Sequence, residues 1–206
     1  MPTAALDNTD YDVLNVVALK RMATADVVAA ASGAAPDVVD ATLGRLADRG
    51  LLVVAGGAAL PTDGAEPALK AAAAQRYASV RGDEDVIALV ARFEHINAQF
   101  LTTMSAWQQV DVGGRKVAND HSDSAYDDKV IGRLEKLAAR LEPLLEALAA
   151  HDPRFAVYPR RFTTALAGID DGRHELVSSP TVDSVHNIWF EFHEDLLRTL
   201  GRDRAE

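Results

Sequence analysis

The sequence contains no cysteine, which excludes disulfide bonds, thiolate zinc sites and thiol catalysis. Long hydrophobic runs are also missing, because the longest apolar stretches are far too short to span a bilayer. The N-terminus lacks the basic region followed by an apolar run that marks a signal peptide. We therefore expect a cytoplasmic protein without a membrane partner.

Positive charge is scarce as well. The formal net charge is −10, whereas proteins that bind polyanions are usually basic, at least locally.

The composition is that of an ordinary globular protein, because 48% of the residues are apolar and 25% are charged. The length of 206 residues allows one full-sized domain or two small ones. Alanine is conspicuous, and because it costs least in a helix, the composition favours a mainly α fold.

The first sixty residues predict three helices and a small β-hairpin. Apolar residues at helical spacing, with Thr24 and Pro36 as start signals, give helices over 9–22, 25–31 and 36–49. Two short apolar runs, at 51–55 and 58–60, flank the tight-turn signal Gly56-Gly57 and predict the hairpin. Helices and hairpin in this order are the winged helix-turn-helix pattern, which we assign to residues 1–64.

Residues 65–206 are predicted to form an α-helical bundle domain. The expected helices span 64–80, 83–109, 126–150, 159–170 and 181–200. Residues 111–125 contain few apolar groups and are predicted to be an exposed loop.

One predicted helix carries a heptad seam. Its members are Val130, Leu134, Leu137, Leu141, Leu144 and Leu148. We favour one wall of an internal bundle over a dimer helix, because Pro143 would disturb a long straight coil. The apolar stripes of this half nevertheless look too numerous for one small bundle to hide, so we expect a homodimer through some helix of it.

Three N-terminal segments resemble bacterial winged-helix regulators of the broad MarR and GntR kind. Residues 24–33 resemble the first helix of their motif with its turn, 46–52 the end of the recognition helix, and 60–64 the exit from the wing. The resemblance implies a transcriptional regulator that binds DNA as a homodimer, with a small-molecule effector as a further expectation.

A second resemblance lies near the C-terminus. Residues 158–162 and 183–197 resemble a segment of actinobacterial proteins, some of which are linked to pyruvate phosphate dikinase-like enzymes. The phosphohistidine and nucleotide motifs of the dikinase are not visible in this chain. This resemblance therefore implies a regulatory or accessory module.

The charges of the third predicted helix oppose DNA binding. Its outer face includes Asp37 and Asp48, whereas recognition helices normally present Arg, Lys, Asn or Gln to DNA. Residues 1–70 hold nine acidic and five basic residues, a net charge of −4. If the domain binds DNA, the expected contacts are Lys20, Arg21, Thr42, Arg45 and Arg49. The alternative is a winged-helix protein-interaction or accessory module that does not bind DNA.

Histidines and aromatic residues of the second half raise the question of a ligand site. His186 and His193 lie seven residues apart on one predicted helix, too far apart to chelate a metal as an i, i+4 pair would. We favour histidines satisfied in the core or at its rim and expect no metal or cofactor. The alternative is a small-molecule pocket lined by His95, Trp107, His186, Trp189 and His193.

Motifs of catalysis do not appear in the sequence. The Asp-rich stretch 120–128 lacks the ligand pattern of a calcium loop and is predicted to be a solvated loop running into a helix. A Ser-His-Asp spacing, a nucleophile elbow and a phosphate-binding Gly-rich loop are likewise missing. We therefore predict that the protein is not an enzyme.

Overall fold

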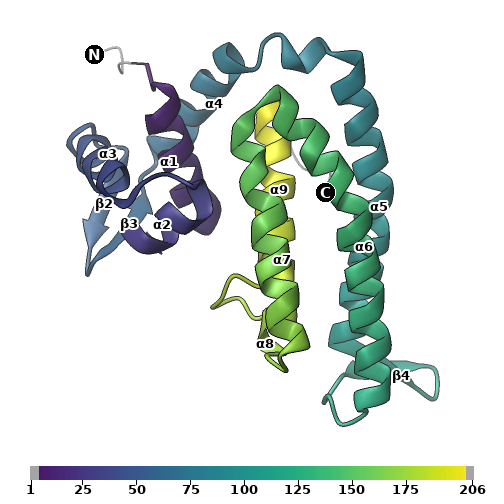
Figure 1. Cartoon of the computed structure of the whole chain (residues 1–206). Helices are drawn as coiled ribbons and strands as arrows, with labels where there is room; N and C mark the ends of the chain where they lie inside the picture. The colour runs from purple at the N-terminus through teal and green to yellow at the C-terminus, as the bar shows by residue number, and fades with distance from the viewer. Residues whose placement is uncertain (1–4, 203–206) are drawn as a thin grey trace. The chain divides into compact units, whose positions relative to one another are not determined.

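A computed structural model describes residues 5–202, and its chain divides into two compact units (Figure 1). The first unit runs up to Asp83 and resumes at Phe190, while the second spans Glu84–Trp189. The first unit thus extends beyond residue 64, where the sequence placed a domain boundary, and takes in the second half of the last helix. Within the described residues, every helix is either too short or too polar to cross a membrane.

Three helices and a small sheet begin the first unit. The elements are α1 (Asn8–Lys20), β1 (Ala23–Thr24), α2 (Ala25–Ser32), α3 (Pro36–Asp48), β2 (Leu52–Ala55) and β3 (Ala58–Pro61). The sheet is antiparallel with strand order β1-β3-β2, and Ala55 lies opposite Ala58. Gly56 and Gly57 turn the chain with φ of 59° and 80°, a region that favours glycine.

One apolar core joins these elements to α4 (Ala65–Arg76). Leu14 of α1, Leu46 of α3 and Leu69 of α4 are each fully buried in it. Burying one such leucine contributes roughly 1.5–3 kcal/mol, so this core accounts for much of the stability of the unit. The 3-10 turn η1 (Val80–Gly82) follows α4, which ends earlier than the helix expected over 64–80.

Polar contacts attach the second half of α9 (Val185–Leu200) to α1. Lys20 Nζ lies 2.9 Å from Glu191 Oε1, and Asn15 Nδ2 donates to Asp195 Oδ1 over 2.7 Å. Asn15 and the two carboxylates are buried, so each has found the partner that a desolvated polar group needs. The helix begins at Val185, four residues after the start that the sequence predicted.

The second unit is helical apart from one hairpin. Its elements are α5 (Glu84–Gln108), β4 (Gln109–Val112), β5 (Arg115–Ala118), α6 (Ser124–His151), η2 (Pro153–Ala156), α7 (Val157–Asp170), α8 (Glu175–Ser178) and the start of α9. Helices α5 and α6 lie side by side. The heptad seam of α6 is buried, each member at most 5% exposed, inside a single chain. The seam therefore forms a wall of this core, as favoured above.

The hairpin β4–β5 corrects one prediction, because the sequence indicated a loop over 111–125. Gly113 and Gly114 adopt φ of 60° and 82° and form its turn, like the glycine pair of the first hairpin. Asp111 pairs with Lys116 across the ladder, and these strands are largely exposed. Strand β4 alternates polar and apolar residues over only four positions and β5 does not alternate, which is why the pattern gave no clear strand signal.

The buried seam leads to a prediction about assembly. Leu141→Ala removes a side chain that is 0% exposed, and it should lower the free energy of unfolding by about 2–5 kcal/mol through lost burial and a cavity. Denaturant titration measures the loss, with Leu101→Ala, at an exposed site of α5, as the control. Light scattering should give the same mass for the native protein and the variant. A drop in mass for Leu141→Ala would instead identify the seam as a dimer contact.

Candidate functional site

Asp10 of α1 binds two arginines at the end of α3, Arg45 in its last turn and Arg49 directly after it. Arg45 Nη2 lies 2.9 Å from one carboxylate oxygen of Asp10, and Arg49 Nη1 lies 2.7 Å from the other. Asp10 itself is only 5% exposed, so its carboxylate depends on these two cations to compensate the charge that water no longer solvates. The two arginines expected to contact DNA thus neutralise an acid of the same domain.

The other three residues expected at DNA are placed differently. The Thr42 side chain is fully buried, and its hydroxyl donates to the Val38 carbonyl over 2.7 Å. Lys20 forms the ion pair with Glu191 described above. Arg21 is exposed at the end of α1, where its φ of 64° lies in the left-handed region. Of the five residues, Arg21 alone projects a side chain into solvent without a partner in the described chain.

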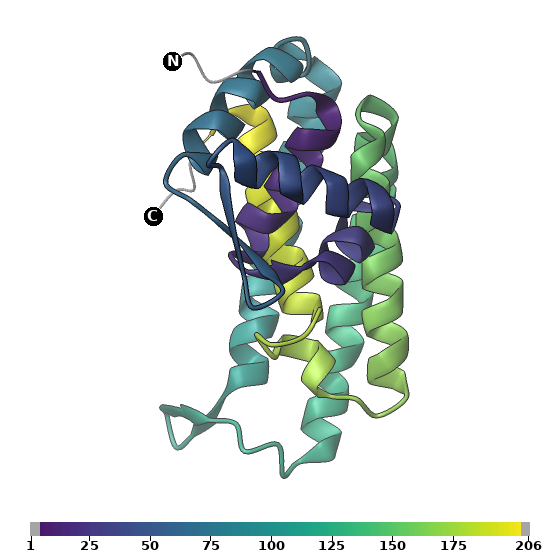
Figure 2. The same cartoon turned by 90° about the vertical axis from the view of Figure 1, so that its left-hand side faces the viewer.

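The exposed surface of α3 and the β2–β3 hairpin, here named the α3–wing face, is mainly acidic and apolar, and its one half-exposed cation, Arg45, is paired with Asp10. Its carboxylates are Asp37, Asp40 and Asp48, and its apolar side chains are Val38, Val53 and Val54, which are 40–54% exposed. Figure 2 shows α3 and this hairpin both turned toward the viewer. A surface of this kind repels a polyanion.

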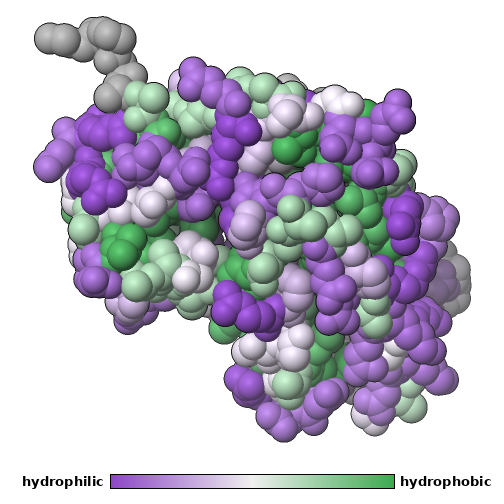
Figure 3. Space-filling view, turned by 45° about the horizontal axis from the view of Figure 1, so that its top comes forward, coloured by the Kyte–Doolittle hydropathy of each residue, from purple (hydrophilic) through white to green (hydrophobic). Residues whose placement is uncertain are grey.

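Elsewhere the exposed apolar groups are scattered. In the view of Figure 3, hydrophobic residues show as small patches between hydrophilic ones. Single exposed apolar residues are normal on a folded protein, so that face gives no sign of a large apolar interface.

Two residues of the predicted aromatic pocket meet in the core of the second unit. Trp189 is 2% exposed and stacks on Phe100, with ring centroids 4.0 Å apart and planes 1° from parallel. Its indole N–H donates to Asn97 Oδ1 over 3.0 Å, which satisfies the one polar atom of the ring. The half-buried His186 ring lies 6.1 Å from Phe100. This arrangement is a packed core with its polar atom satisfied.

The structure does not gather the other three residues around that stack. His95 is exposed on α5 and lies beside Gln99, with 3.1 Å between their side-chain nitrogens. Trp107 lies seven residues after Phe100, roughly 10 Å further along the helix. His193 is half-buried in the part of α9 that belongs to the first unit.

Trp107 instead contacts a polar cluster that the sequence did not reveal. Its ring centroid is 4.4 Å from that of His121, whose Nδ1 lies 2.9 Å from Oδ2 of the buried Asp127. Asn119 Nδ2 donates to the other oxygen of Asp127 over 2.9 Å. Because a carboxylate only accepts, Nδ1 of neutral His121 carries the proton and Nε2 keeps its lone pair.

The polar cluster of Asn119, His121 and Asp127 closes the turn between β5 and α6, and the His121 side chain is partly exposed. In the described chain, no three His, Asp or Glu side chains converge as metal ligands. In the sequence, these three residues near the start of α6 look like ordinary helix-capping residues, so no signal pointed to a cluster.

No protein-family model, curated protein or solved structure matches the chain.

The half-buried position of His186 predicts a pH dependence of stability. Burial lowers the pKa of His186 below its ordinary value of 6.5. As the pH falls through 6.5, the unfolded chain binds a proton that the folded protein resists, so the free energy of unfolding should fall. His186→Gln should reduce this loss between neutral and mildly acidic pH, as measured by denaturant titration. His95→Gln is the control at an exposed histidine, and equal slopes for all three proteins would contradict the prediction.

Proposed function

We propose that residues 8–61 form a winged helix-turn-helix domain and that the protein is an accessory module that binds another protein, not DNA, through the α3–wing face. The order of elements supports the domain assignment, with three helices, a hairpin and a short first strand that joins the hairpin in one sheet. Fold alone says nothing about the ligand of such a domain, so the choice of partner depends on the chemistry of its surface.

The observation that carries the proposal is the pairing of Asp10 with Arg45 and Arg49. Non-specific affinity for DNA comes mainly from cations that neutralise phosphates. If both arginines turned toward DNA, Asp10 would stay behind as a buried carboxylate without a charged partner. Leaving a buried polar group unpaired costs roughly 1–3 kcal/mol, and more when the group is charged. Release of the arginines is therefore unfavourable.

The composition of the α3–wing face points to the chemistry of the partner. Its three exposed carboxylates favour a basic protein surface, and its exposed valines favour an apolar centre within that surface. A second copy of this chain docked through the same face in a two-fold arrangement would bring like charges together, so we propose a different protein. The resemblance of residues 183–197 makes a pyruvate phosphate dikinase-like enzyme the first partner to test.

The first test of the proposal is DNA binding. The native protein should give no gel shift with duplex DNA of its own upstream region at low salt. Asp37→Asn with Asp48→Asn removes two exposed charges, and this variant should gain weak, salt-sensitive binding because repulsion falls. Glu135→Gln with Glu146→Gln changes the net charge equally on exposed positions of α6 and is the matched control. Tight native binding at physiological salt that is abolished by Arg45→Ala with Arg49→Ala would establish the DNA-binding regulator instead.

The second test is photo-crosslinking in cells from a reactive residue at position 54, with position 117 of β5 as the control. Val54 and Val117 are both exposed strand residues, but only Val54 belongs to the α3–wing face. One protein should crosslink from position 54, and Asp37→Asn with Asp40→Asn should weaken that product because it removes charges from the face. Equal products from both positions, or a product only with DNA, would contradict the proposal.

A further inference from the structure

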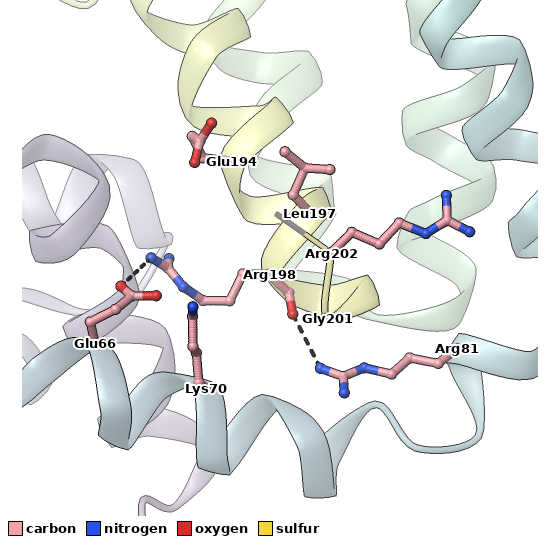
Figure 4. Close-up of a pocket in the computed structure, with 8 residues that line it drawn as sticks. All are labelled: Glu66, Lys70, Arg81, Glu194, Leu197, Arg198, Gly201 and Arg202. Carbon is pink, nitrogen blue, oxygen red and sulfur yellow. Dashed lines mark hydrogen bonds and ion pairs between the residues drawn. The ribbon is translucent and has the colours of Figure 1, made fainter. Parts of the chain in front are cut away.

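A cavity of about 310 Å³ lies in the first unit between α4, η1 and the end of α9. It is lined by Glu66, Lys70, Arg81, Glu194, Leu197, Arg198, Gly201 and Arg202. Figure 4 shows Lys70 and Arg198 on the same side of the cavity as Glu66, while Arg81 reaches in from η1. Its volume is at the lower end of the range for small-molecule sites.

The charge of this cavity is opposite to that of the whole protein. Four of its lining residues are basic and two are acidic, which gives a net charge of +2 in a chain of −10. Counted over these lining residues alone, two carboxylates cannot neutralise four cations, so the lining carries an excess of positive charge. Cations gathered in a concave site focus their field on the space between them.

Two of the arginines are held in place by contacts of the fold. Arg198 donates from Nη2 to Glu66 Oε2 over 2.8 Å and from Nη1 to Asn15 Oδ1, while its buried Nε donates to no described residue. Arg81 donates from Nε to the Thr199 carbonyl and from Nη2 to the Arg198 carbonyl, over 2.9 and 3.3 Å. The site is therefore partly preorganised.

Gly201 makes the position of Arg81 possible. Its φ is 66°, and a Cβ at this position would come within 2.8 Å of the Arg81 guanidinium. A side chain there would push Arg81 off the end of α9. The glycine thus serves both the helix end and the cavity.

We propose that this cavity binds a small phosphate monoester. Such a group is close to a dianion at neutral pH, which matches the net charge of +2. Arginine forks and a lysine ammonium are the side chains that bind phosphate oxygens in proteins. A ligand of this class would join α4, η1 and the end of α9, and it should stabilise the first unit. The inference does not depend on the partner of the α3–wing face.

The test is calorimetric titration of the full chain with glycerol 3-phosphate at constant ionic strength. Binding should saturate at millimolar concentration or below, and the ligand should raise the unfolding temperature because it binds only the folded protein. Lys70→Gln with Arg202→Gln should weaken the affinity roughly tenfold or more, because two of the four cations are lost. Arg133→Gln with Lys136→Gln, at exposed positions of α6, removes the same charge outside the cavity and should bind like the native protein.

Three results would overturn the proposal. One is the lack of saturable binding by the native protein up to about 10 mM, where even weak metabolite sites fill. Another is equal weakening in the cavity variant and the α6 variant, which would show general charge attraction. The third is binding of succinate as tight as that of glycerol 3-phosphate, which would remove the assignment to phosphate. Unfolding of each variant without ligand checks that the fold is retained.

Discussion

The buried carboxylate of Asp10 is the constraint on which the first unit depends. Asp10 lies in the first turn of α1, and its backbone N–H donates to the Asp7 side chain that caps the helix, over 2.7 Å. The negative charge of Asp10 interacts favourably with the helix dipole at this end. The two carboxylate oxygens of Asp10 form ion pairs with Arg45 and Arg49, which lie one turn apart at the end of α3. The same contacts that fix α3 against α1 also pair both arginines with an acid of the fold, although the Arg45 side chain stays 50% exposed. The stability of this helix pair and the engagement of its arginines thus have one physical cause.

The second half of α9 extends this pattern of paired charge. Glu191 and Asp195 are buried on the helix, and Lys20 and Asn15 of α1 satisfy them. Apolar burial alone would hold such a helix with little orientational preference, whereas these directional contacts allow one register of α9 on α1. That register brings the last turn of the helix to Arg81, and the cationic cavity is lined by both. The cavity is therefore a consequence of how α9 docks.

Local patterns in the sequence were sufficient to predict most of the fold but little of the sites. Apolar spacing placed α3 and α6 to within two residues at each end, because each buries one continuous face. The hairpin β4–β5 escaped prediction because its strands bury no face. The pairing of Asp10 with the arginines joins residues 35 and 39 positions apart, and no local period encodes it. Likewise, the stripe on α9 indicated a protected Trp189 but could not show that His95 is exposed.

Net charge is a poor guide to the ligands of this protein, because its charges are segregated within one unit. The α3–wing face leaves carboxylates exposed and pairs its arginines with Asp10, while the cavity beside α4 gathers more cations than acids. What a surface can bind is set by the charge that remains after the fold has made its own pairs. By that measure the α3–wing face suits a basic protein, and the cavity suits a small dianion. Formal charge alone agrees with the first of these preferences but not with the second, because a chain of −10 gives no sign of a cavity whose lining carries +2.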